Sequence, residues 1–178
     1  MALISVNFNG LFRGQMPKEE KVNAPKHSIE RRLSELGIVL PEVPKPMANY
    51  VPYVRSGALL FLSGQGPRRP EGGFYTGRVG AEVSVEEAYK HARIVGVGLL
   101  AAMRDAVGDL DKVVRVVKLL GLVNGGPGFS EAPRVINGCS DLLVEVFGER
   151  GRHARSALGA GGLPGDMTVE IEAIVEVG

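Results

Sequence analysis

Apolar residues recur at helical spacing near the start of the chain. The segment begins at Ser28, a residue type suited to the N-cap, and its apolar positions are Ile29, Leu33 and Leu36. Gly37 follows directly, and glycine is the usual residue just past a helix C-terminus. This pattern predicts a short helix over residues 28–36.

Two longer segments have the same periodicity. The second helix is predicted to begin with the capping box Ser84-Val-Glu-Glu87, in which Ser84 is the N-cap, and to end before Gly108. The third is predicted to span residues 132–147. The apolar positions of these two helices are Ala88, Ala92, Val95, Leu99, Met103, Ala106, Val135, Leu142, Leu143 and Val146. Gly96 and Gly98 are poor helix formers, so we expect them to let the second helix approach a sheet closely.

The segments with strand composition are residues 53–55, 58–63, 113–123, 154–158 and 168–177. The run at 58–63 is apolar throughout, which predicts a strand buried on both faces. In the last segment Glu170 and Glu172 alternate with apolar residues, so both glutamates share one face.

The order is helix, two strands, helix, strand, helix and two strands, which predicts an α+β fold with helices on one face of a single sheet. Residues 41–52 contain four prolines and read as an extended connector, and residues 64–77 as a loop. Residues 1–23 have little pattern and are interpreted as an arm.

Composition narrows the class of protein. The chain has 178 residues, which suits a single domain, and its net charge of +1 with 6% aromatic residues argues against nucleic-acid binding. The single cysteine, Cys139, excludes an internal disulfide and is interpreted as a small buried residue. No membrane span or signal peptide is recognisable, so a cytoplasmic protein is expected.

Catalytic motifs of the common kinds are missing. The chain has no Walker-type phosphate loop, zinc-protease motif or serine-hydrolase motif. Its histidines, His27, His91 and His153, lack metal-ligand spacing, so no metal site is predicted. His91 falls on the second helix and is expected to be partly exposed.

The candidate chemistry lies near the C-terminus. Arg155 stands in a short strand of small and apolar residues, where a guanidinium requires an anionic partner. Two interpretations remain open on these residues alone. Arg155 either forms a structural ion pair, with Glu170 and Glu172 on a solvated face, or it binds a carboxylate ligand.

The segment HARSALGAGGLPGDMTVEIEAIV at residues 153–175 resembles the C-terminal signature of the Rid family, the reactive intermediate deaminases, also called YjgF-like or L-PSP-like proteins. The resemblance covers roughly residues 47–177. It includes the fifteen-residue interval between Arg155 and Glu170 and the segment LLFLSGQGP at residues 59–67, which contains Ser63 and Gly64. Tyr50 and Asn137 fall near the positions of the family's pocket tyrosine and helical asparagine.

The resemblance implies a chorismate-mutase-like fold, a mixed sheet with two long helices on one face, and a homotrimer with pockets between subunits. It implies residues 1–46 as an added arm, helix and connector, and residues 47–178 as the family domain. Arg155 and Glu170 would be catalytic. Tyr50, Ser63, Gly64 and Asn137 would bind the substrate, a small carboxylate, without a metal or cofactor.

The implied activity is hydrolysis of enamine or imine acids to 2-keto acids with release of ammonia. Ala157 departs from the pattern, because many members that carry out this chemistry have cysteine there. A carboxylate-binding trimer without catalysis therefore stands as an alternative, and an endoribonuclease, an activity also associated with parts of the family, as another.

Overall fold

The computed structural model describes residues 28–43 and 49–178. The strands are β1 (Tyr53–Ser56), β2 (Leu59–Gln65), β3 (Val113–Asn124), β4 (Ala154–Ala160) and β5 (Val169–Val177). The α-helices are α1 (Ser28–Glu35), α2 (Val85–Val107) and α3 (Ala132–Phe147), and the 3-10 helices are η1 (Leu110–Lys112), η2 (Gly148–Gly151) and η3 (Pro164–Asp166). The predicted arm and the predicted domain boundary after residue 46 lie outside the described residues.

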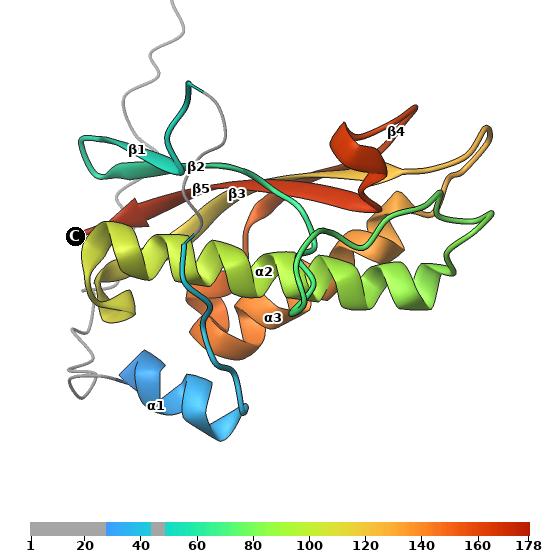
Figure 1. The fold of residues 1–178 in the computed structure, drawn as a ribbon. Helices are drawn as coiled ribbons and strands as arrows, with labels where there is room; N and C mark the ends of the chain where they lie inside the picture. The colour runs from blue at the N-terminus through green and yellow to red at the C-terminus, as the bar shows by residue number, and fades with distance from the viewer. Residues whose placement is uncertain (1–27, 44–48) are drawn as a thin grey trace, which may run out of the picture.

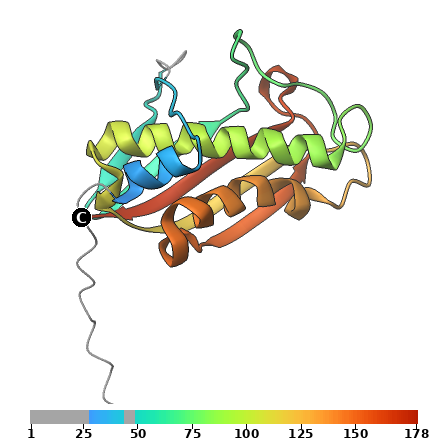
Figure 2. The ribbon, with the colours of Figure 1, turned by 90° about the horizontal axis from the view of Figure 1, so that it is seen from below.

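The strands form one mixed sheet in the order β1-β2-β5-β3-β4. β3 and β4 are parallel, because α3 connects them across one face, whereas all other neighbours are antiparallel. Helices α2 and α3 lie side by side beneath the sheet (Figures 1 and 2). This confirms the predicted α+β fold with two long helices on one face.

The two long helices approach each other closely at two glycines. A Cβ on Gly138 of α3 would collide with the backbone carbonyl of Tyr89 on α2, and a Cβ on Gly96 would meet Leu142 of α3. Gly96 therefore serves the contact between helices, not the predicted contact with the sheet. Gly98 does face the sheet, since its Cβ would meet the amide of Gln65 at the end of β2.

Among the described residues, no α-helix covers the other face of the sheet (Figure 1). Leu60 and Leu62 of β2 are buried against the helices, but Phe61 between them is 41% exposed. The prediction that this run is buried on both faces is therefore wrong for the single chain. The exposed apolar side chains of this open face include Val54, Leu59, Phe61 and Leu158.

Helix α1 packs beside α3 and η1, with Ile29 and Leu33 buried in the core (Figure 2). Its N-terminus is capped from outside the helix. Ser28 is the first helical residue, and its hydroxyl donates to the Asp111 carboxylate at 2.7 Å, as does the Ile29 amide at 3.2 Å. Asp111 of η1 therefore caps the N-terminus of α1, the role predicted for Ser28 from the sequence.

β2 continues two residues further than predicted, to Gln65. Leu62 pairs with Ala173 of β5 and Gln65 pairs with Ile171, so β2 holds one extra residue at Ser63 and Gly64. This β-bulge bends the strand at the place where the candidate site begins.

Candidate functional site

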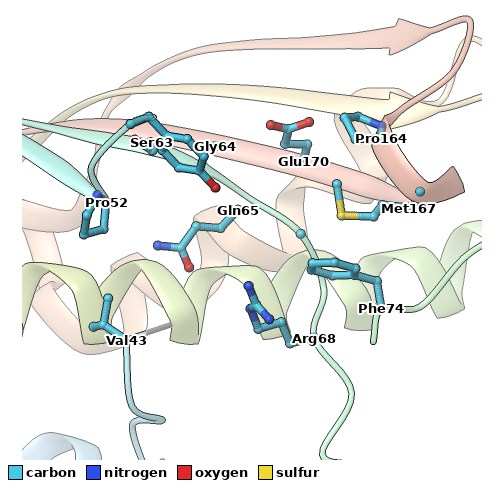
Figure 3. Close-up of a pocket in the computed structure, with 13 residues that line it drawn as sticks. Val43, Pro52, Ser63, Gly64, Gln65, Arg68, Phe74, Pro164, Met167 and Glu170 are labelled. Carbon is cyan, nitrogen blue, oxygen red and sulfur yellow. The ribbon is translucent and has the colours of Figure 1, made fainter. Parts of the chain in front are cut away.

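A cavity of about 340 Å³ lies where β2 bulges away from β5. Four of the predicted site residues line it: Tyr50, Ser63, Gly64 and Glu170. The remaining wall residues are Val43, Pro52, Gln65, Gly66, Arg68, Phe74, Pro164, Gly165 and Met167 (Figure 3). The cavity therefore has mostly apolar walls around one carboxylate and one guanidinium.

Gly64 allows β2 to pass directly over the Glu170 carboxylate. A Cβ at this position would overlap Glu170 Oε1, so every other residue type would push the carboxylate aside. Figure 3 shows the Glu170 carboxylate pointing toward Gly64 and away from α2. Bulge and glycine together leave the carboxylate at the cavity surface.

Ser63 fastens the segment before β1 to the bulge. Its hydroxyl donates to the carbonyl of Val51 at 2.7 Å, and its amide donates to the carbonyl of Pro52 at 3.0 Å. These bonds hold the neighbouring Tyr50, which is 54% exposed, at the mouth of the cavity. In the single chain Ser63 therefore positions Tyr50.

Glu170 has the electrostatics of a proton-transfer group. Burial raises the pKa of its carboxyl above the usual value, and the charge of Glu172 on the same face raises that pKa further. A carboxylate with a raised pKa is a better base toward water than an ordinary surface glutamate.

Arg155 lies on β4, and its guanidinium is held by α3. Nη1 donates to Asn137 Oδ1 at 2.9 Å and to Ser140 Oγ at 3.0 Å, and Nη2 donates to the Pro133 carbonyl at 3.4 Å. No carboxylate among residues 28–43 and 49–178 forms an ion pair with it. The structural ion pair considered from the sequence is therefore not formed within this part of the chain.

The acceptors on α3 leave one edge of the guanidinium available. Nη1 has two hydrogens, and both are used by Asn137 and Ser140. Nε has no acceptor in the described part of the chain, and Nη2 retains a hydrogen. Two parallel N–H donors on a planar fork match the two oxygens of a carboxylate.

The predicted residues fall into two separate groups. Leu119 of β3 pairs with Arg155, whereas Leu122 of β3 pairs with Glu170, and positions three apart on a strand point to opposite faces. Arg155 and Asn137 therefore lie on the helix side at the β4 edge. Tyr50, Ser63, Gly64 and Glu170 lie around the cavity beyond β3, so one chain does not bring the two groups together.

Two polar residues around Arg155 were missed from the sequence: Ser140 and His153, whose Nε2 lies 3.0 Å from Ser140 Oγ. Pro133, Asn137 and Ser140 recur at helical spacing on one face of α3, and that spacing was a readable signal. Arg68, stacked over Phe74 with its Cζ 4.9 Å from the ring centre, gave no sequence signal because it stands in a loop.

Other candidate groups have structural surroundings. Burial raises the pKa of the Cys139 thiol to about 12, so this cysteine is a buried apolar residue, as predicted. His91 is buried, stacked on Tyr75 and 3.1 Å from Thr168 Oγ1, so the expectation of partial exposure is wrong. Within the described ranges no three His, Cys, Asp or Glu side chains could hold a metal ion. No helix there is long and apolar enough to cross a membrane.

Comparison with known proteins agrees with this architecture. The family described as "YjgF/chorismate mutase-like, putative endoribonuclease" matches residues 30–171. Protein TCP17 of Trypanosoma cruzi is 47% identical over 150 residues, which cover 84% of this chain and 94% of that protein.

Two solved structures are similar over the same portion of the chain. A protein of unknown function from Agrobacterium tumefaciens has 48% sequence identity and a TM-score of 0.77, with 84% of this chain and 94% of that chain covered. A structure titled a putative endoribonuclease from Shewanella oneidensis has 34% identity and a TM-score of 0.80, with 84% and 99% covered. The chain belongs to the YjgF-like, or Rid, family, as its C-terminal motif predicted.

Proposed function

We propose that this protein hydrolyses reactive enamine and imine acids to 2-keto acids, with release of ammonia, in pockets between the subunits of a homotrimer. The observation that carries the proposal is the free donor edge of Arg155, formed by Nε and the remaining hydrogen of Nη2. The guanidinium donates to three acceptors on α3 and has no carboxylate partner in the described ranges. A small carboxylate is the ligand that this edge fits.

The separation of the two groups supports a pocket built by two chains. Arg155 and Asn137 lie at the β4 edge, while the cavity around Glu170 lies beyond β3. The exposed apolar residues of the open face, among them Phe61 and Leu158, need a protein partner to be removed from water. In a closed trimer each pocket would take Arg155 from one subunit and Glu170 from the next.

The chemistry then follows from the two groups. Arg155 holds the substrate carboxylate, which places C2 of the imine at the cavity. Glu170, as a carboxylate, takes a proton from water while the oxygen adds to C2. Glu170 passes this proton to the nitrogen, which gives a carbinolamine. It then moves the second proton from the new hydroxyl to the nitrogen, so that the C2–N bond breaks as the C2=O double bond forms. Ammonia leaves, and a 2-keto acid remains. Because the imine is reactive without help, positioning supplies most of the acceleration.

The test is release of 2-keto acid when a threonine or serine dehydratase generates the imine in the presence of the purified protein. Arg155→Ala is expected to lower the protein-dependent rate roughly 10- to 100-fold, the size expected when hydrogen bonds to a charged group are lost. Arg152→Ala is the matched control, because Arg152 is exposed and pairs with Glu149. An unchanged rate in Arg155→Ala would falsify the proposal.

The second candidate function is binding of a small carboxylate without turnover. Ala157, half-buried on β4 two residues after Arg155, favours it, because it removes the thiol of many active relatives. Calorimetry with pyruvate separates the two functions: Arg155-dependent binding without any increase in keto-acid release supports the binding protein.

A further inference from the structure

Ser140 and His153 form a chain of hydrogen bonds that ends on Arg155. Arg155 Nη1 donates to Ser140 Oγ at 3.0 Å, Ser140 Oγ lies 3.0 Å from His153 Nε2, and His153 Nδ1 lies 2.6 Å from the Gly151 carbonyl. The chain links η2, β4 and α3 at the place where the guanidinium is held.

The Gly151 carbonyl determines which ring nitrogen of His153 carries a hydrogen. A backbone carbonyl only accepts, so we assign the hydrogen of His153 to Nδ1. In the neutral ring Nε2 is then an acceptor, and the Ser140 hydroxyl donates to it. The hydroxyl oxygen stays oriented to accept from Arg155. In this hydrogen-bond network each donor then has an acceptor.

Protonation of His153 would reverse one of these bonds. Nε2 would become a donor to Ser140, whose oxygen would then receive hydrogens from both His153 and Arg155. The Ser140 hydroxyl hydrogen would then lose His153 Nε2 as its acceptor. The cationic side chains of His153 and Arg155 would both donate to the same Ser140 oxygen. The neutral ring is therefore the form that supports the guanidinium.

We propose that His153 is a positioning residue that, through Ser140, holds Arg155 with its free donor edge toward the ligand, and that it does so only as the neutral imidazole. The inference rests on the proposed role of Arg155 as the carboxylate clamp. It adds a residue that does not touch the ligand but sets the pH range in which the clamp binds.

The surroundings of His153 favour the neutral ring. Burial lowers the pKa of His153 below its ordinary value of 6.5, the Gly151 carbonyl opposes this shift, and the charge of Arg155 lowers the pKa further. Arg155, which is joined to the ring through Ser140 of α3, is the charged side chain that acts on His153. On η2 and beyond it Glu149 and Arg152 pair with each other.

The experiment measures pyruvate affinity of the full-length protein by calorimetry from about pH 8 to about pH 5, the range in which a histidine titrates. The wild type is expected to lose affinity on the acid side. His153→Gln should remove that acid-side loss and keep the neutral-pH affinity, because its amide oxygen can accept from Ser140 and cannot protonate. Light scattering at each pH confirms that the oligomer is unchanged.

Removing the support should weaken binding at neutral pH, where the wild-type imidazole is uncharged. His153→Leu and Ser140→Ala are each expected to bind pyruvate roughly three- to tenfold more weakly, because this corresponds to the net contribution of one hydrogen bond. The Ser140→Ala/His153→Leu double variant should bind pyruvate no more weakly than Ser140→Ala, because both changes interrupt the same series of hydrogen bonds. His91→Gln, the control at a buried histidine that is remote from Arg155 in the hydrogen-bond network, should keep the acid-side loss.

The outcomes separate this inference from the proposed function. Wild-type affinity in a folded His153→Leu protein, or an acid-side loss that persists in His153→Gln, overturns the positioning role while Arg155→Ala still abolishes binding. Pyruvate binding that ignores Arg155→Ala, or no binding by the wild type, overturns both. Absence of keto-acid release with Arg155-dependent binding overturns the hydrolysis alone.

Discussion

Arg155 and Glu170 point to opposite faces of one sheet and are separated by β3, although they stand only fifteen residues apart in the chain. The backbones of β4 and β5 lie two strand spacings apart, roughly 10 Å. This separation within one chain is the reason for the proposal that a second subunit supplies one of the two groups to each pocket.

This relationship predicts complementation between two inactive variants. Arg155→Ala and Glu170→Gln, co-expressed with different tags in equal amounts, should regain about a quarter of wild-type keto-acid release, because random assortment gives that share of pockets both native groups. Co-expression of Arg155→Ala with the Arg155→Ala/Glu170→Gln double variant should regain nothing. Failure of the first mixture to exceed its parents, with trimers intact, argues for a pocket within one chain.

The raised pKa of Glu170 predicts a measurable pH shift. Glu172 adds negative charge beside Glu170 and so disfavours its ionised form. Glu172→Gln should lower the pKa of Glu170, which moves the acid-side fall in keto-acid release to lower pH without changing the plateau. Glu176→Gln, on the same face at the far end of β5, is the control. A shift to higher pH would contradict Glu170 as the base.

The open face of the sheet predicts how the oligomer can be disrupted. Phe61→Ser removes an apolar side chain that is 41% exposed in the single chain and is expected to shift the protein toward monomers, seen by light scattering. Keto-acid release should fall with it. Val39→Ser is the matched control, since Val39 is 88% exposed but lies before the sheet. A fully trimeric Phe61→Ser protein would point to a different interface.

A side chain added at Gly138 is expected to destabilise the fold. A Cβ there would collide with the backbone of Tyr89, which cannot rotate away, so α2 and α3 would have to separate. Gly138→Ala should lower the free energy of unfolding by about 1–3 kcal/mol or more, measured by urea denaturation. Gly126→Ala, which has no atom within 4 Å of the added carbon, should change it little.

Much of the fold was predictable from local pattern. The third helix has the predicted bounds, α2 begins after Ser84 as its capping box predicts, and the alternation in β5 places Glu170 and Glu172 on one face. These features depend on residues a few positions apart, whose spacing selects helix or strand directly. The C-terminal motif also identified the family that the comparisons then established.

Long-range placement was not predictable in the same way. Asp111 caps α1 from 83 residues away, and Gly96 faces another helix and not the sheet. The bulge at Ser63 and Gly64 depends on how β2 pairs with β5. Each depends on which elements become neighbours, and no local spacing encodes that choice.

By itself the sequence determined the family and singled out Arg155 and Glu170 as candidates for chemistry, because a guanidinium among small residues and a motif of fixed spacing are readable along the chain. Only the tertiary structure decided that Arg155 is held by α3 through Asn137 and Ser140, and that Glu170 faces the other way. The physical reason is the sheet itself: strand order and register set distance and direction, and both arise only when distant segments pair.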